Sequence, residues 1–130
     1  IRNFENDLLN NVDIITIDIS FISITKILEK IGTINNAKEI ICLIKPQFEC
    51  GKEIADKYKG IILNKEIHKN IIKRIIDSFL KINYYLNGLT FSPIKGGNGN
   101  IEYLAYFTKI NVNNVVNIDK LVEETFNKLK

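Results

Sequence analysis

The sequence predicts an α/β fold in which parallel strands alternate with helices and a final strand runs antiparallel to the others. Short apolar runs rich in β-branched residues alternate with longer segments whose apolar residues recur at helical spacing. The resulting order, strand–helix–strand–helix–strand–strand–helix, favours a parallel sheet. Because the last two strands follow each other directly, we expect an antiparallel addition at one edge. Four such strands correspond to the second half of a doubly wound domain.

The first strand–helix unit lies near the N-terminus. The run Ile14–Ile19 is interrupted only by Thr16 and Asp18, and near-continuous β-branched residues indicate a strand covered on both faces. Ser20 follows this strand and can cap a helix, and Gly32 is placed to end that helix. The predicted buried face of the helix consists of Phe21, Ile24, Ile27, Leu28 and Ile31.

A second buried strand is predicted in the stretch EIICLIK, which ends on Lys45 with Pro46 directly behind it. Proline provides no backbone donor, so the strand cannot continue its ladder there. The segment from Pro46 to Lys59 is polar and irregular. We expect it to be a long loop, either functional or disordered.

The longest predicted helix runs from Lys65 to about Ile82, with Asn64 as its N-cap. Its buried stripe consists of Ile67, Ile71, Ile72, Ile75, Ile76, Phe79 and Leu80. The basic residues that lie mostly away from this stripe are Lys65, Lys69, Lys73, Arg74 and Lys81. We interpret them as a solvated face.

Two strands and a helix complete the chain. The stretches YYLNGLTFSPI and NIEYLAYFTKI are predicted strands, and the glycine-rich KGGNGN between them suits a hairpin or another tight antiparallel return. In the final segment, NIDKLVEETFNKLK, one helical face holds Ile118, Leu121, Val122, Phe126 and Leu129.

Composition narrows the class of protein. The 130 residues suffice for one compact domain, and a chain that is 45% hydrophobic and 25% charged is not a disordered one. The net charge of +3 permits contact with nucleic acid without arguing for it. No window approaches the ~18 continuous apolar residues that span a bilayer. Cys42 lies in an apolar strand close to Cys50, which favours a reduced, cytoplasmic setting over a disulfide.

Charged residues close the first two predicted strands, where ligands bind in open α/β sheets. Asp18 closes the first strand and Lys45 closes the second. If the strands are neighbours, these opposite charges lie side by side at the functional edge. Two plainer interpretations stay open. Asp18 assists the cap of the following helix, or Lys45 is a strand end whose stem is buried and whose charge reaches water.

Glu102 lies at the start of NIEYLAYF, in an otherwise apolar strand. A carboxylate in this position is unfavourable unless it faces water or a partner. The alternative is an edge-strand charge that deters aggregation. Together with Asp18 and Lys45, it would form one site, in which a lysine is held between two carboxylates and its protonation state is tuned by its neighbours.

The glycine-rich loop from Gly96 to Asn100 joins two strands and does not open a helix. This context favours a turn or a flexible, substrate-facing loop over a phosphate cradle. The candidate substrate-binding residues in it are Gly97, Asn98 and Asn100. His68 has no ligand-type residue at a suitable spacing, so we interpret it as structural and expect no metal site.

Four sequence blocks resemble the TlyA (hemolysin A) family, whose members carry an FtsJ-like methyltransferase domain. In chain order they are TIDISFISITKIL, LIKPQFECGK, GIILNKEIH and SPIKGGNGNIEYL, and the resemblance extends to about Ile110. One departure occurs in the third block, where Asn64 and Lys65 stand in place of the family's usual Asp-Pro. Asparagine still caps a helix, so we expect little consequence.

The resemblance implies a fold and an activity. The fold is the C-terminal half of a Rossmann-like methyltransferase fold, and the activity is methylation of ribose 2′-hydroxyls of ribosomal RNA with S-adenosylmethionine. Three members of the family's Lys-Asp-Lys-Glu catalytic set correspond to Asp18, Lys45 and Glu102. Lys45 would help to deprotonate or steer the hydroxyl, while Asp18 and Glu102 position it. Asp18 is also implied as a cofactor-binding residue.

The resemblance also implies that residues 1–130 form a single partial domain. The family's first catalytic lysine, its glycine-rich cofactor loop, the first three strands of its sheet and its N-terminal S4 domain are not found in this sequence. We therefore expect these residues alone to bind S-adenosylmethionine weakly or not at all, and not to methylate RNA. The first predicted strand would then present a bare apolar edge, which favours self-association.

Two other functions stay open from the sequence. One is a membrane-damaging hemolysin, as the family's second name suggests, although no amphipathic or spanning segment of sufficient length is present. The other is a non-catalytic RNA-binding module, although the positive charge of the chain is diffuse.

Overall fold

The computed structural model describes residues 13–33, 37–111 and 116–129 of the chain. These residues form a four-stranded sheet in the order β1-β2-β4-β3. The strands are β1 (Ile14–Ile17), β2 (Glu39–Ile44), β3 (Tyr85–Phe91) and β4 (Tyr103–Thr108). The predicted α/β class is confirmed.

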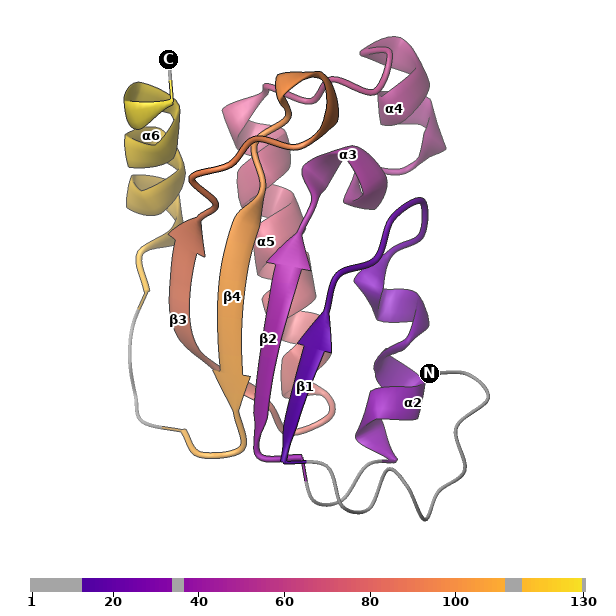
Figure 1. The fold of residues 1–130 in the computed structure, drawn as a ribbon, viewed down its shortest axis with the longest axis vertical. Helices are drawn as coiled ribbons and strands as arrows, with labels where there is room; N and C mark the ends of the chain where they lie inside the picture. The colour runs from indigo at the N-terminus through magenta and orange to yellow at the C-terminus, as the bar shows by residue number, and fades with distance from the viewer. Residues whose placement is uncertain (1–12, 34–36, 112–115, 130) are drawn as a thin grey trace.

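The sheet combines a parallel and an antiparallel part. β1 and β2 are parallel, whereas β4 is antiparallel to both β2 and β3. The hairpin of β3 and β4 forms one side of the sheet, as expected (Figure 1). The prediction that the antiparallel strand lies at the edge is wrong, because β4 returns into the place beside β2 and leaves β3 outermost.

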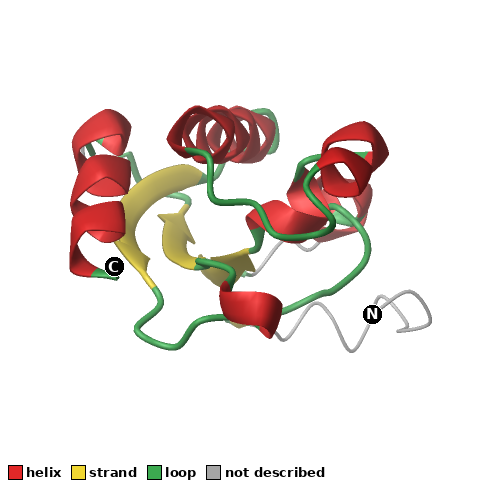
Figure 2. Ribbon diagram, turned by 90° about the horizontal axis from the view of Figure 1, so that it is seen from above, coloured by secondary structure: helices red, strands yellow, loops and turns green. Residues whose placement is uncertain are grey.

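Helices connect the strands and cover the sheet. They are η1 (Ile24–Lys26), α2 (Leu28–Gly32), α3 (Pro46–Glu49), α4 (Lys52–Lys57), α5 (Lys65–Leu80), η2 (Gly97–Gly99) and α6 (Ile118–Lys128). α5 begins as predicted, with Asn64 as its N-cap. It lies behind the sheet in Figure 1, and the view from above in Figure 2 shows the same layering. Between α5 and the sheet, the rings of Phe79 and Phe107 stack with centroids 4.0 Å apart.

One face of the sheet carries the core. The buried residues of β1, β2 and β4 alternate along each strand, and they are Ile15, Ile17, Ile40, Cys42, Ile44, Tyr103, Ala105 and Phe107. The residues between them are more exposed, and Ile14 is 49% exposed. The prediction that the first strand is covered on both faces is therefore wrong for the described part of the chain. A continuous run of β-branched residues does not distinguish the two faces.

The chain does not enter a helix at Ser20. Phe21 adopts a left-handed conformation with a φ of 71°. Ser23 caps η1 instead, because its side chain accepts a hydrogen bond from the backbone N–H of Thr25. The predicted cap at Ser20 is wrong, since the turn at Phe21 separates that serine from the helix.

The segment after β2 is more regular than predicted. Pro46 stands at the start of α3, where the missing N–H of proline costs no hydrogen bond. Gly51 then adopts a φ of 86°, which suits glycine, and α4 follows it directly. The expected irregular loop is therefore wrong. Its polar composition concealed two short helices, because none of the residues of α4 is buried.

The basic side of α5 is not simply a solvated face. Lys65 and Lys69 contact Glu123 of α6, with Nζ–O distances of 2.7 and 3.3 Å. Further along, Lys73 lies 3.2 Å from a carboxylate oxygen of Asp119. The solvated interpretation is wrong for Lys69, whose side chain is 11% exposed, whereas Lys65 and Lys73 remain partly exposed beside the acidic residues of α6.

A buried histidine links α5 to β4. His68 Nε2 lies 2.7 Å from the carbonyl oxygen of Ile62, and His68 Nδ1 lies 2.7 Å from the hydroxyl of Tyr103. A carbonyl oxygen only accepts, so Nε2 carries the proton and Nδ1 accepts from the tyrosine. His68 therefore has the structural role predicted for it, and burial lowers the pKa of its ring.

We expect the free energy of unfolding to fall as the pH drops below 6.5, the usual pKa of histidine. The unfolded chain binds a proton there, whereas the buried His68 ring resists protonation, so acid favours the unfolded state. Urea titrations between about pH 8 and about pH 5 measure this effect. His68→Gln keeps an amide donor near the Ile62 carbonyl but does not titrate. An equally steep fall in that variant would contradict the assignment.

Candidate active site

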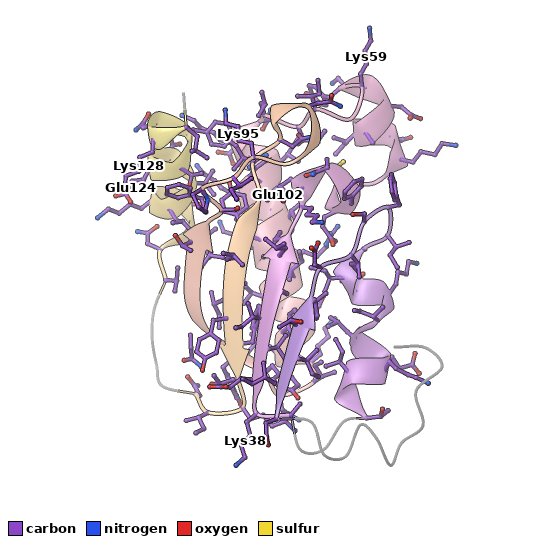
Figure 3. All side chains as sticks on the ribbon, viewed as in Figure 1. Lys38, Lys59, Lys95, Glu102, Glu124 and Lys128 are labelled. Carbon is purple, nitrogen blue, oxygen red and sulfur yellow. The ribbon has the colours of Figure 1, made fainter. Side chains whose placement is uncertain are left out.

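The predicted site residues meet at one end of the sheet. The last residue of β2 pairs with the first residue of β4, so Lys45 and Glu102, just beyond this pair, lie opposite each other. Asp18 follows β1, the parallel neighbour of β2, at the same end. Figure 3 shows Glu102 at this end of the molecule and Lys38 at the other.

Lys45 is held by an ion pair. Its Nζ contacts Oδ1 of Asp18 and donates a hydrogen bond to Ser20 Oγ at 3.4 Å. The Lys45 side chain is 13% exposed, whereas that of Asp18 is 65% exposed. The lysine stem is thus packed, while its charged end contacts the exposed carboxylate of Asp18. Because an ammonium group has three donors, one is left for a ligand.

Glu102 is held from two sides. Gln47 Nε2 donates a hydrogen bond to Glu102 Oε2 at 2.8 Å. From the other side, the carboxylate lies against Gly96, where an added Cβ would stand 2.2 Å from the same oxygen. The carboxylate therefore occupies space that glycine leaves open.

A pocket of about 500 Å³ connects these groups. Its lining includes Ser20, Phe21, Lys45, Gln47, Asn98 and Glu102. Phe21 is 86% exposed, and its ring centroid lies 4.9 Å from that of Phe48. An exposed aromatic ring beside a polar pocket offers a surface on which a planar group can stack.

The predicted substrate loop also lines this pocket. Within it, Asn100 is buried, and its Oδ1 accepts a hydrogen bond from the backbone N–H of Ile62 at 2.9 Å. Its Nδ2 donates to the carbonyl oxygens of Gly60 and Gly97 at 2.8 and 2.9 Å. The Asn100 amide thus fastens the loop to the segment before α5. Gly97 and Asn98 are exposed at the rim.

A buried carboxylate fixes the segments that carry the site. Glu49 of α3 accepts hydrogen bonds from Ser23 Oγ at 2.6 Å and from the backbone N–H of Ile24 at 2.8 Å. Arg74 of α5 lies 2.8 Å from the same carboxylate and donates to the Glu49 carbonyl oxygen at 2.9 Å. The chain after β1, the chain after β2 and α5 are therefore tied together at one point.

Gln47 and Phe21 are among the pocket residues that were not predicted from the sequence. Gln47 belongs to the LIKPQFECGK block, but its role depends on α3, which brings its amide to Glu102. Phe21 was predicted on the buried face of a helix, and this is wrong, because its positive φ places it in a turn and leaves the ring exposed. A polar residue directly behind a strand that ends in a charge is the signal that points to Gln47.

The arrangement can bind and polarise a hydroxyl group. A lysine ammonium donates hydrogen bonds, carboxylates accept them, and Lys45 and Glu102 line the same pocket. Asp18 fixes the lysine from the adjacent strand end. Within the described ranges, no group of three or more His, Cys, Asp or Glu residues could hold a metal ion.

Comparison with known proteins assigns the chain to a family. The model of the family described as FtsJ-like methyltransferase matches residues 1–109. The chain belongs to the FtsJ-like methyltransferase family. The resemblance carried by the four sequence blocks is thereby confirmed. The pocket lies where β1 and β2 of this methyltransferase domain end.

Relatives of this FtsJ-like methyltransferase chain are known from several bacteria. It is 48% identical to "Hemolysin A" of Brachyspira hyodysenteriae over 101 residues, which cover 72% of this chain and 39% of that protein. It is 38% identical over 112 residues to the Campylobacter jejuni protein named "23S rRNA (cytidine-2'-O)-methyltransferase TlyA", with coverages of 84% and 42%. A solved structure from Streptococcus thermophilus superposes with a TM-score of 0.83 at 30% identity, covering 98% of this chain and 48% of that one. The chain spans less than half the length of these relatives.

We expect Glu49→Ala to lower the free energy of unfolding by about 2–4 kcal/mol. The substitution leaves the Arg74 guanidinium and the Ile24 N–H without the buried carboxylate that they share. Urea denaturation measures the loss. Glu53→Ala, at an exposed position of α4, is the matched control and should change stability by less than about 0.5 kcal/mol. Equal effects of the two substitutions would show that the contacts of Glu49 do not stabilise the fold.

Proposed function

We propose that this chain forms the methyl-acceptor side of an enzyme that methylates ribose 2′-hydroxyls of ribosomal RNA with S-adenosylmethionine. The observation that carries the proposal is the ion pair of Lys45 and Asp18, set beside Glu102 at the edge of the sheet. The name of the Campylobacter relative supports both the ribose hydroxyl and ribosomal RNA as the target. In this proposal the enzyme works in the cytoplasm, where ribosomal RNA is found.

Lys45 is the residue proposed to act on the hydroxyl. Its ammonium donates a hydrogen bond to the hydroxyl oxygen and helps deprotonation by stabilising the negative charge that develops there. Asp18 fixes the direction of the lysine Nζ. Glu102 accepts the hydrogen bond of the hydroxyl, orients the hydroxyl oxygen toward the incoming methyl group, and takes up the proton as the methyl group is transferred.

The described residues fit the methyl donor in part. S-adenosylmethionine, when bound, supplies a methyl group carried on a positively charged sulfur. The exposed carboxylate of Asp18 is suited to lie near that positive charge. Because Asp18 also contacts Lys45, it would fix the position of the methyl donor relative to the lysine that acts on the hydroxyl.

Other features of the pocket suit an RNA substrate. Phe21 exposes a ring on which a nucleobase can stack. Gly97 and Asn98 present backbone and amide groups at the rim, where they can bind ribose or phosphate. In this proposal Asn100 serves the substrate indirectly, by holding the loop in place.

One relative carries the name hemolysin A. In residues 13–33, 37–111 and 116–129, no helix is both long and apolar enough to cross a membrane. In a non-catalytic RNA-binding role, the ion pair of Lys45 and Asp18 would only join the ends of two neighbouring strands. Methyl transfer gives each of these charged groups a task, and this is why we favour it.

In the full-length protein, we expect Lys45→Ala to lower methyl transfer to ribosomal RNA by about a hundredfold or more. The group that acts on the hydroxyl is lost, while the fold is kept. Labelled S-adenosylmethionine measures transfer, and thermal melting checks the fold. Lys38→Ala, at the opposite end of the molecule (Figure 3), is the control. Unchanged transfer in a folded Lys45→Ala protein would remove Lys45 from this role.

Residues 1–130 by themselves are expected to bind S-adenosylmethionine more weakly than the micromolar range. The sequence has no glycine-rich loop that opens a helix, the element that commonly binds nucleotide-type cofactors. Isothermal calorimetry on this chain measures the affinity directly. A micromolar dissociation constant would contradict the expectation.

We expect residues 1–130 to self-associate through β1. Among the described residues β1 pairs only with β2, and Ile14 on it is half exposed. An unpaired apolar strand edge readily pairs with another chain. Light scattering should give a mass that rises with protein concentration, and Ile14→Lys should reduce this rise. A constant monomer mass at high concentration would count against the idea.

A further inference from the structure

Gln47 is a buried side chain with half of its amide unpaired. The residue is 9% exposed. Its Nε2 donates to Glu102 Oε2 at 2.8 Å, whereas its own Oε1 is buried without a hydrogen-bond partner among the described residues. Because an unpaired buried acceptor destabilises a fold, packing alone does not explain a glutamine at this position.

The contact with Glu102 determines which end of the Gln47 amide stays unpaired. With the amide turned over, Oε1 would face a carboxylate oxygen at hydrogen-bond distance, and two acceptors repel each other. The NH₂ group is the end that is compatible with the 2.8 Å separation. The unpaired carbonyl is therefore a consequence of binding Glu102.

Gly96 confines the Glu102 carboxylate from the other side. Its φ of −75° is open to any residue, so the backbone does not require glycine here. Space does require it, because a Cβ would stand 2.2 Å from Glu102 Oε2 and 2.8 Å from Glu102 Cδ. The Gly96 N–H donates to the carbonyl oxygen of Asn100 at 2.7 Å, which fixes the glycine within its loop.

We propose that Gln47 and Gly96 are positioning residues that together fix the Glu102 carboxylate opposite Lys45. Gln47 engages Oε2 and Gly96 leaves the space for it, so that Oε1 faces the hydroxyl on which Lys45 acts. The inference rests on the proposed function, in which Glu102 orients that hydroxyl. The unpaired Gln47 carbonyl lowers the stability of the fold, and the same side chain holds the Glu102 carboxylate in one position.

Gln47→Met tests the first half of the proposal. Methionine has a similar length and no amide, so the unpaired acceptor disappears while Glu102 loses its donor. In the full-length protein, kcat for methyl transfer should fall roughly tenfold to a hundredfold, and the melting temperature should stay constant or rise. An unchanged kcat would overturn the proposal, and so would a melting temperature that falls together with kcat.

Gly96→Ala tests the second half. The new Cβ displaces the Glu102 carboxylate without straining the backbone, so kcat should fall by a similar factor. If both residues act through Glu102, the double variant is little slower than either single variant, whereas losses that multiply would overturn the proposal. Gly88→Ala is the control and should keep the full rate, since its Cβ would meet Tyr106 Cβ at an ordinary 3.7 Å.

Gln47→Glu gives a readout that a merely structural residue would not move. It sets a second carboxylate at hydrogen-bond distance from Glu102, and the two then share a proton. The other charged groups of this cluster are Lys45 and, through it, Asp18. The acidic limb of the kcat–pH profile should move upward by about one pH unit or more, with partial recovery in alkali. An unshifted profile would overturn the proposal.

Glu102→Gln separates failure of this proposal from failure of the proposed function. If the wild-type protein methylates RNA and Glu102→Gln is slow, but Gln47→Met is not, then the positioning role fails and the proposed function stands. If Glu102→Gln is as fast as the wild type, or the wild type does not methylate ribose, the role assigned to Glu102 fails, and the positioning role fails with it.

Discussion

The buried carboxylate of Glu49 is the interaction on which the geometry of the pocket depends. Glu49 lies in α3, just after β2. Its carboxylate accepts hydrogen bonds from Ser23 and Ile24, in the segment after β1, and forms an ion pair with Arg74 of α5. The ion pair of Asp18 and Lys45 also joins the segment after β1 to the segment after β2, at a place nearer the pocket. Each contact supports the other, because neither segment can move away without breaking both.

Sheet topology adds the second carboxylate to this arrangement. β4 is antiparallel to β2, so its first residue meets the last residue of β2. Glu102, just before β4, therefore lies at the same end of the sheet as Lys45, just after β2. A strand parallel to β2 in the same place would begin at the opposite end of the sheet. The place of β4 beside β2 brings Glu102 to the end of the sheet where the parallel pairing of β1 and β2 already places Asp18 and Lys45.

Local patterns predicted what depends on local physics. Apolar periodicity and the Asn64 cap located α5, and charges at strand ends pointed to Asp18, Lys45 and Glu102. The order of the strands depends on long-range pairing, so the place of β4 could not be read from its own residues. The exposure of Phe21 depends on one positive φ. The contact of Gln47 with Glu102 joins residues 55 positions apart, which no local pattern encodes.

We propose that this pocket presents a ribose hydroxyl for methylation. Mass spectrometry of nucleosides tests it most directly, using ribosomal RNA treated with the full-length protein and S-adenosylmethionine. A second RNA, with 2′-deoxyribose at the modified nucleotide, serves as the comparison. We expect a 2′-O-methylated nucleoside from the first RNA and no methylation at that nucleotide of the second. A methyl group on a base, or equal methylation of both RNAs, would contradict it.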